Sequence, residues 1–187
     1  VPFVGVVPAI KPAAQLVGAG RIGVLATTRT VEDEYVARLI RTFAPDNEVR
    51  LVAAGGLVEL IEQRLGSFSR DELDHALEAP SARLLESEVD AVVLGCTHFI
   101  HVRADVERLL GDAAQVVDSV DGVVRQTLRV AGPPDASPAG GAGAGAAPHD
   151  ARLLLSDASA APASYRYLAR THGMNLSDAA PRHGTHR

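Results

Sequence analysis

Short runs of Val, Ile and Leu alternate with stretches of helical periodicity along this chain, and this alternation restricts the folds that it can adopt. The runs are apolar throughout rather than alternating with polar residues, so both faces of the sheet must be covered. A parallel sheet with helical crossovers meets that requirement. We therefore predict an α/β fold with a doubly wound parallel sheet. The strands expected from these runs are Phe3–Val7, Arg21–Thr27, Val49–Ala54, Asp90–Leu94, Gln115–Asp118 and Arg152–Ser156.

The helices are predicted from apolar spacing and from capping residues. We expect Thr30 to cap the second helix. Ser69 and Glu72 form a capping box before a long helical region, and we expect Pro80 to split that region into two helices. The other predicted helices are Lys11–Gly18, Val31–Phe43, Leu57–Leu65, Val102–Leu110, Val123–Val130 and Ser164–His172.

Two segments depart from this pattern in composition. Gly132–Pro148 consists almost entirely of Gly, Ala, Pro and Ser, which is typical of a linker or surface loop. Residues 175–187 are polar, and we expect a flexible tail there.

Charge and cysteine content narrow the functional classes. The 187 residues include 18 Lys and Arg against 23 Asp and Glu, a net charge of -5, whereas a nucleic-acid-binding protein usually has a basic excess. There is no apolar run of about 18 residues, so we expect no membrane partner. The single cysteine excludes an internal disulfide framework and favours a reducing compartment, for which we predict the cytoplasm.

The cysteine comes directly after a predicted strand, in the sequence Gly95-Cys96-Thr97-His98. Ligands of an open parallel sheet bind beyond the carboxyl ends of its strands. A helix N-terminus lowers the pKa of a thiol from its ordinary value of about 8.5. Cys96 can therefore be a reactive thiol, with His98 as a proton relay or hydrogen-bond donor. The alternative is an inert cysteine in the core.

Other polar residues follow the same edge of the predicted sheet. Thr27 and Thr30 can hold a substrate carboxylate where the strand passes into its helix, although capping alone accounts for Thr30. Glu62 lies on a predicted helix and can face the same rim, or it can simply be solvated.

We expect neither a metal nor a cofactor. Cys96, His98 and His101, and separately His183 and His186, have zinc-like spacings. The first set, however, flanks a turn where neighbouring side chains diverge, and the second lies in the tail. No P-loop and no G-x-G-x-x-G after a strand is present.

The motif Gly95-Cys96-Thr97-His98-Phe99 resembles the second cysteine motif of the bacterial glutamate racemases. Weaker matches follow in the order of that family, and together they cover nearly all of the chain except the linker and the tail. They are Val4–Ala9, Gly23–Val31, Leu57–Glu62, Val117–Ser119 and the return at RLLLS and YRYLA.

The resemblance implies a cofactor-independent isomerase that interconverts L- and D-glutamate for peptidoglycan synthesis. Two cysteines act there from opposite faces of the α-carbon. Cys96 would be the catalytic thiol on the L-glutamate face, with His98 assisting it and Glu62 orienting His98. The substrate-binding residues implied are Thr27, Thr30, Thr97 and His98. The resemblance leaves the oligomeric state open, a homodimer included.

The chain also departs from that family. Neither an Asp-Ser-x-x-Gly turn nor a Cys-Asn-Thr motif is present, and Ile100-His101 replaces the usual Pro-Leu. We expect a C-terminal portion lacking roughly the first third, inactive by itself. The segments implied are 1–19 (end of a first-domain half), 20–119 (complete second domain), 120–131 (connecting helix), 132–149 (linker), 150–174 (return to the first domain) and 175–187 (tail).

Three alternatives remain open at this point. Aspartate and hydantoin racemases share the architecture, although His98 favours glutamate. A decarboxylase of the same superfamily would need only one cysteine. A non-catalytic binding protein could retain the pocket.

Overall fold

The computed structural model describes residues 2–132 and 151–179. The chain divides into two compact units. Unit 1 contains Val1–Ile61 and Ser69–Pro134, and unit 2 contains Glu62–Phe68 and Asp135–Arg187. None of the described helices has the length and apolar character needed to cross a membrane.

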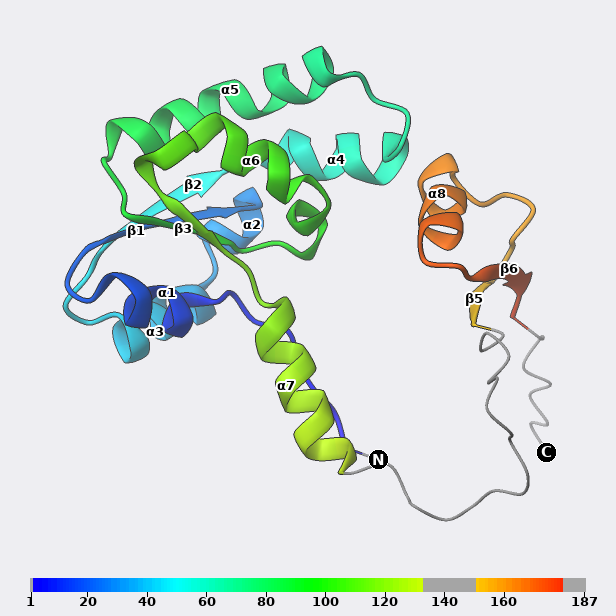
Figure 1. Cartoon of the computed structure of the whole chain (residues 1–187), viewed down its shortest axis with the longest axis horizontal. Coiled ribbons are helices and arrows are strands. Elements are labelled where there is room, and N and C mark those ends of the chain that lie inside the picture. The colour runs from blue at the N-terminus through cyan, green and yellow to red at the C-terminus, as the bar shows by residue number, and fades with distance from the viewer. Residues whose placement is uncertain (1, 133–150, 180–187) are drawn as a thin grey trace. The chain divides into compact units, whose positions relative to one another are not determined.

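A four-stranded parallel sheet forms the centre of unit 1, in the order β2-β1-β3-β4 (Figure 1). The two inner strands are almost wholly buried, as their continuous apolar runs require. This confirms the predicted α/β fold class. The strands are β1 (Arg21–Ala26), β2 (Glu48–Ala53), β3 (Ala91–Leu94) and β4 (Gln115–Val117).

Helices cover both faces of this sheet. In Figure 1, α1 and α3 lie on one side of the strands, and α5 and α6 lie on the other. Along residues 2–132 the helices are α1 (Ile10–Val17), α2 (Thr28–Val31), α3 (Glu34–Phe43), α4 (Gly55–Arg64), α5 (Arg70–Glu86), the 3₁₀ turn η1 (Thr97–Val102), α6 (Arg103–Leu110), the 3₁₀ turn η2 (Gly111–Ala113) and α7 (Val120–Ala131).

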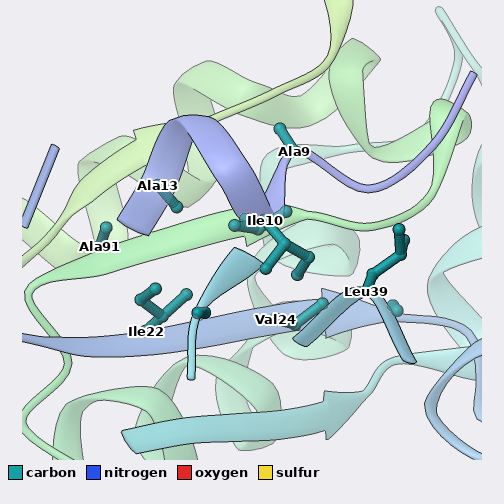
Figure 2. Packing of buried hydrophobic residues seen from close by; sticks show 10 residues of the cluster. Ala9, Ile10, Ala13, Ile22, Val24, Leu39 and Ala91 are labelled. Carbon is teal, nitrogen blue, oxygen red and sulfur yellow. The ribbon is translucent and has the colours of Figure 1, made fainter. Parts of the chain in front are cut away.

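The core on the α1 side is a tight apolar contact between helix and sheet. Figure 2 shows Ile10 and Ala13 of α1 above Ile22 and Val24 of β1. All four side chains are fully buried, and burial of a side chain such as Ile contributes about 1.5–3 kcal/mol. This packing holds β1 and β3 in the core, and the loops that follow these two strands start from it.

Unit 2 contains a strand–helix–strand element, with two parallel strands in register. Its elements are β5 (Arg152–Leu155), α8 (Ala163–Thr171) and β6 (Asn175–Asp178). We expected residues 175–187 to be a flexible tail, but Asn175–Asp178 forms the last strand. It does so because it pairs with β5 along its whole length. The predicted linker lies almost entirely outside the described residues, as does the rest of the tail.

The prediction that Pro80 ends a helix is wrong. Helix α5 continues from Arg70 to Glu86 with Pro80 inside it. An interior proline costs about 3 kcal/mol. Leu77 and Leu84, which share the buried face of α5 with Pro80, are both fully buried. Their burial, at about 1.5–3 kcal/mol each, outweighs that cost.

Two other local predictions also fail. Thr30 caps no helix, because Thr27 caps the short α2 and Asp33 caps α3. The apolar run Phe3–Val7 is irregular and not a strand. None of the described strands pairs with it, and a lone strand leaves its backbone groups without a ladder.

Candidate functional site

The order of the strands creates a topological switch point at the carboxyl edge of the sheet. The connection from β1 to β2 passes over the face that carries α3, whereas the connection from β3 to β4 passes over the face that carries α6. Adjacent strands whose connections pass over opposite faces form such a switch point, and α/β proteins bind their ligands there. The switch point lies between the ends of β1 and β3.

Thr27 and Cys96 begin the two loops that leave the sheet at this switch point. The register pairs Leu25 with Leu94, so Thr27 and Cys96 come two residues later on neighbouring strands, which run about 4.8 Å apart. The amide of Gly95 donates to the carbonyl of Leu25 at 2.8 Å. The structure thus brings together the two loops that the sequence singled out.

Cys96 and His98 contact each other in the turn after β3. The Cys96 Sγ lies 3.5 Å from Nδ1 of His98, within hydrogen-bond distance for sulfur. Both residues are half-buried, and Thr97 between them is exposed. A half-buried thiol beside an imidazole is an arrangement that can exchange a proton with a bound substrate.

The turn itself differs from the expected α-helix start. Cys96 is the N-cap of η1, and its side chain makes no capping hydrogen bond. The α-helix α6 begins only at Arg103. The thiol therefore contacts the His98 imidazole at the start of a 3₁₀ turn, and not the N-terminus of an α-helix.

Gly95 faces the neighbouring strand. A Cβ added there would lie 3.0 Å from the Cβ of Ala26 and 3.2 Å from Cγ1 of Val24. The space that a side chain would need at this position is filled by β1. The glycine lets β1 and β3 approach each other at the point where the thiol emerges.

The two threonines after β1 are bonded to each other. Oγ1 of Thr27 accepts from the amide of Thr30 at 3.1 Å, and the two hydroxyl oxygens lie 2.8 Å apart. Both residues are half-buried. Their polar atoms are held beside the switch point, where a carboxylate could accept from a hydroxyl or an amide.

Glu62 lies on α4 with an exposed side chain. Its backbone carbonyl accepts a hydrogen bond from Oγ of Ser164. Glu62 is assigned to unit 2 and His98 to unit 1, and the predicted contact between them stays a prediction.

Arg103 is a feature that the sequence reasoning missed. Its guanidinium donates to Oδ2 of Asp118 at 2.5 Å, to the carbonyl of Val116 at 3.0 Å and to Oε1 of Glu107 at 2.7 Å. The hydrogen bond that Arg103 donates to Glu107, together with Asp118, raises the pKa of Arg103. Of these three contacts, the sequence could indicate only the one with Glu107, from the i,i+4 spacing of the two residues.

A cavity of about 420 Å³ lies beside this ion pair, lined by the N-terminal segment, α3, the end of β4 and α7. Its described lining includes Arg103 and Asp118 but none of the predicted site residues. Cys96 and His98 therefore lie at the switch point of the sheet and do not line this cavity.

Within residues 2–132 and 151–179, no three His, Cys, Asp or Glu side chains are grouped closely enough to hold a metal ion. His183 and His186 lie outside the described residues.

Comparison with known proteins gives a consistent match. The Asp/Glu/Hydantoin racemase family matches residues 1–127. The glutamate racemase of Shewanella sp. (strain ANA-3) is 40% identical over 126 residues, covering 67% of this chain and 45% of that protein. The glutamate racemase of Proteus mirabilis (strain HI4320) is 43% identical over 129 residues, covering 68% and 44%. The chain thus spans just under half the length of these relatives.

Solved structures agree with this match. Escherichia coli glutamate racemase, crystallised with L-glutamate and the activator UDP-MurNAc-Ala, has a TM-score of 0.72 and 31% identity, covering 93% of this chain and 63% of that one. Francisella tularensis glutamate racemase, crystallised with D-glutamate, has a TM-score of 0.62 over 90% of this chain; at 17% identity it shows the shared fold alone. The sheet, the position of its cysteine and the family match over residues 1–127 lead to one assignment: the chain belongs to the Asp/Glu/hydantoin racemase family.

Proposed function

We propose that this chain provides one of the two proton carriers, Cys96, of a cofactor-independent racemase that interconverts L- and D-glutamate. The observation that supports it most strongly is the contact between the Cys96 thiol and the His98 imidazole at the switch point of a racemase-family sheet. The product would serve peptidoglycan synthesis, which places the protein in the cytoplasm.

The proposed chemistry needs a base and an acid on opposite faces of the α-carbon. The Cys96 thiolate takes the α-proton of L-glutamate and becomes a thiol, and the electron pair of the broken C–H bond stays on carbon. A donor on the other face then protonates that carbon, which gives D-glutamate. His98 accepts the proton from Sγ, so that Cys96 is a thiolate again when the next reaction begins.

The substrate must be held so that its carboxylate bears the developing negative charge. Thr27, Thr30 and Thr97 have hydroxyl and amide groups suited to that task, in the manner of an oxyanion site. Glu62 would orient His98. These roles follow the family motif residue by residue.

This sequence contains no second thiol that could donate the proton on the other face, because Cys96 is its single cysteine. We therefore propose that residues 20–119 form a complete domain that carries one face of the site. In the same proposal residues 150–174 belong to the other domain, whereas helix α1 (Ile10–Val17) packs on the sheet of unit 1 and is counted with it. By itself this chain would exchange a proton on one face without inverting the centre.

Protection of Cys96 from iodoacetamide tests the substrate class. The single thiol gives one adduct, which intact-mass spectrometry counts without ambiguity, and Cys96→Ser supplies the blank. L-glutamate should slow the alkylation, whereas L-aspartate, hydantoin and an arylmalonate should leave it unchanged.

The other outcomes of this panel are equally informative. Protection by aspartate or hydantoin would assign a sister racemase, and protection by the arylmalonate would assign a single-cysteine decarboxylase. An alkylation rate that no compound changes would contradict the proposed site.

A further inference from the structure

We infer that Arg103 is a positioning residue that holds the Cys96–His98 turn against strand β4. The inference rests on the proposed role of Cys96, but it concerns a different part of the chain. Arg103 is the residue that ends η1, and its amide donates to the carbonyl of Ile100. It therefore stands where the reactive turn passes into α6.

The guanidinium of Arg103 links three segments. It donates to Glu107 one turn along α6, to the carboxylate of Asp118 after β4, and to the backbone carbonyl of Val116 within β4. Two of these three acceptors lie within or directly after β4, the strand beside β3. A movement of η1 away from the sheet would have to break both.

Asp118 makes this link stiff. Its side chain is only 8% exposed, against 41% for Arg103. While Oδ2 accepts from Arg103, Oδ1 accepts from the amide of Val120 at 2.8 Å. Both oxygens of a nearly buried carboxylate are thus engaged, and removing its cationic partner would leave a charge that is costly to bury.

The Gly95 end of the turn is fixed independently, because the Gly95 amide is bonded to β1. On the other side of the turn, Phe99 and Val102 lie between His98 and Arg103 and are 0% and 1% exposed. Cys96, Thr97 and His98 lie between the Gly95 anchor and the Arg103 anchor. Because the Sγ–Nδ1 contact depends on the shape of this turn, loosening its far end should weaken the contact.

An arginine is required for this geometry. The planar guanidinium presents several N–H groups in a fixed fork, which can reach a carboxylate and a carbonyl at once. The ammonium of a lysine is a point charge on a flexible stem. Arg103→Lys should therefore recover part of the effect of Arg103→Met, because it keeps the charge but not the fork.

The test is the second-order rate constant for alkylation of Cys96 by iodoacetamide at pH 7, measured on the full 187-residue chain. Arg103→Met should lower it about three- to tenfold, the change expected when one net hydrogen bond is lost. The matched control is Arg108→Met, which removes ion pairs to Asp74 and Asp105 from the same helix at similar exposure. That control should change the rate by less than about twofold.

A double-mutant cycle with His98→Gln separates positioning from general support. If Arg103 acts through the thiol–imidazole contact, Arg103→Met has no further effect once His98 is replaced. Circular dichroism at the assay temperature selects variants that are folded, and Arg103→Lys provides the comparison if Arg103→Met does not fold.

Each result distinguishes the inference from the proposed function. An unchanged rate in Arg103→Met, or an equal fold-change with and without His98, would overturn the role of Arg103 while leaving protection by glutamate intact. No effect of His98→Gln would also overturn it. If neither His98→Gln nor glutamate changes the rate, both the inference and the proposed function fail.

Discussion

Replacing Gly95 by alanine should destabilise the sheet where the thiol emerges. The added Cβ would lie 3.0 Å from the Ala26 Cβ, 3.2 Å from Val24 Cγ1 and 3.3 Å from the Leu25 carbonyl oxygen. Optimal carbon–carbon separations are about 3.5–4.0 Å, so all three neighbours would have to move. Ala26 and Val24 are fully buried in the central strand and have no free space to move into.

The expected magnitude follows from two opposing effects. Overpacking costs about 1–3 kcal/mol. The lower entropy of an unfolded alanine returns about 0.4–1 kcal/mol. We therefore expect Gly95→Ala to lower the free energy of unfolding by about 1–2 kcal/mol, measured by urea denaturation with circular dichroism.

Gly55→Ala is the matched control. Its Cβ would lie 3.1 Å from Oγ1 of Thr28, nearly the same distance as at Gly95. The hydroxyl of an exposed threonine can rotate away, and alanine is favoured over glycine in a helix by about 1 kcal/mol. Gly55→Ala should be neutral or stabilising. Wild-type stability in Gly95→Ala, or an equal loss in both variants, would refute the argument that rigid neighbours decide the outcome.

Two further predictions concern local hydrogen bonds. Ser69→Ala removes one half of a capping box with Glu72, and thermal and urea unfolding should show a loss of about 1 kcal/mol; an unchanged free energy would contradict the role of the cap. The pKa of Asp157 lies below its ordinary value of 3.8, chiefly because the Ser159 hydroxyl donates to the carboxylate. A lowered pKa stabilises the folded state above the ordinary value, and this contribution is lost as the pH falls through the folded pKa. Carbon-13 NMR titration should show the pKa of Asp157 rising toward 3.8 in Ser159→Ala, and no change there would count against the assigned cause.

The sheet could be predicted because its inner strands are indicated by their own residues. The two inner strands, β1 and β3, are almost continuous apolar runs, and predicting them needed no knowledge of their partners. The capping box at Ser69 is likewise contained within four residues. These features depend on backbone propensity and on the period of burial, both of which are readable along the chain.

The failures arise where tertiary contacts decide. Pro80 is tolerated because the face of α5 around it is buried. The local rule that a helix ends before a proline takes no account of such burial. The capping roles of Thr27 and Asp33 depend on a break after α2 that the periodicity did not reveal. Asn175–Asp178 is polar and yet forms a strand, because β5 supplies its ladder partner.

The candidate site divides in the same way. Cys96, His98 and Thr27 could be predicted because strand ends of a parallel sheet meet at one edge. The ion pair between Arg103 and Asp118 joins residues fifteen positions apart, and neither residue type nor spacing predicts such a contact. A charged residue just after the cysteine turn indicates a contact with the neighbouring strand only when the strand order is known.

The most direct test of the central claim is hydrogen–deuterium exchange at the α-carbon of glutamate. The chain is incubated in D₂O with L-glutamate or with D-glutamate, and proton NMR and chiral chromatography follow each sample. We predict loss of the α-proton signal from L-glutamate with its configuration retained, and no exchange in Cys96→Ala. Exchange that persists in Cys96→Ala, or wild-type protein that leaves the α-proton in place, would contradict the account.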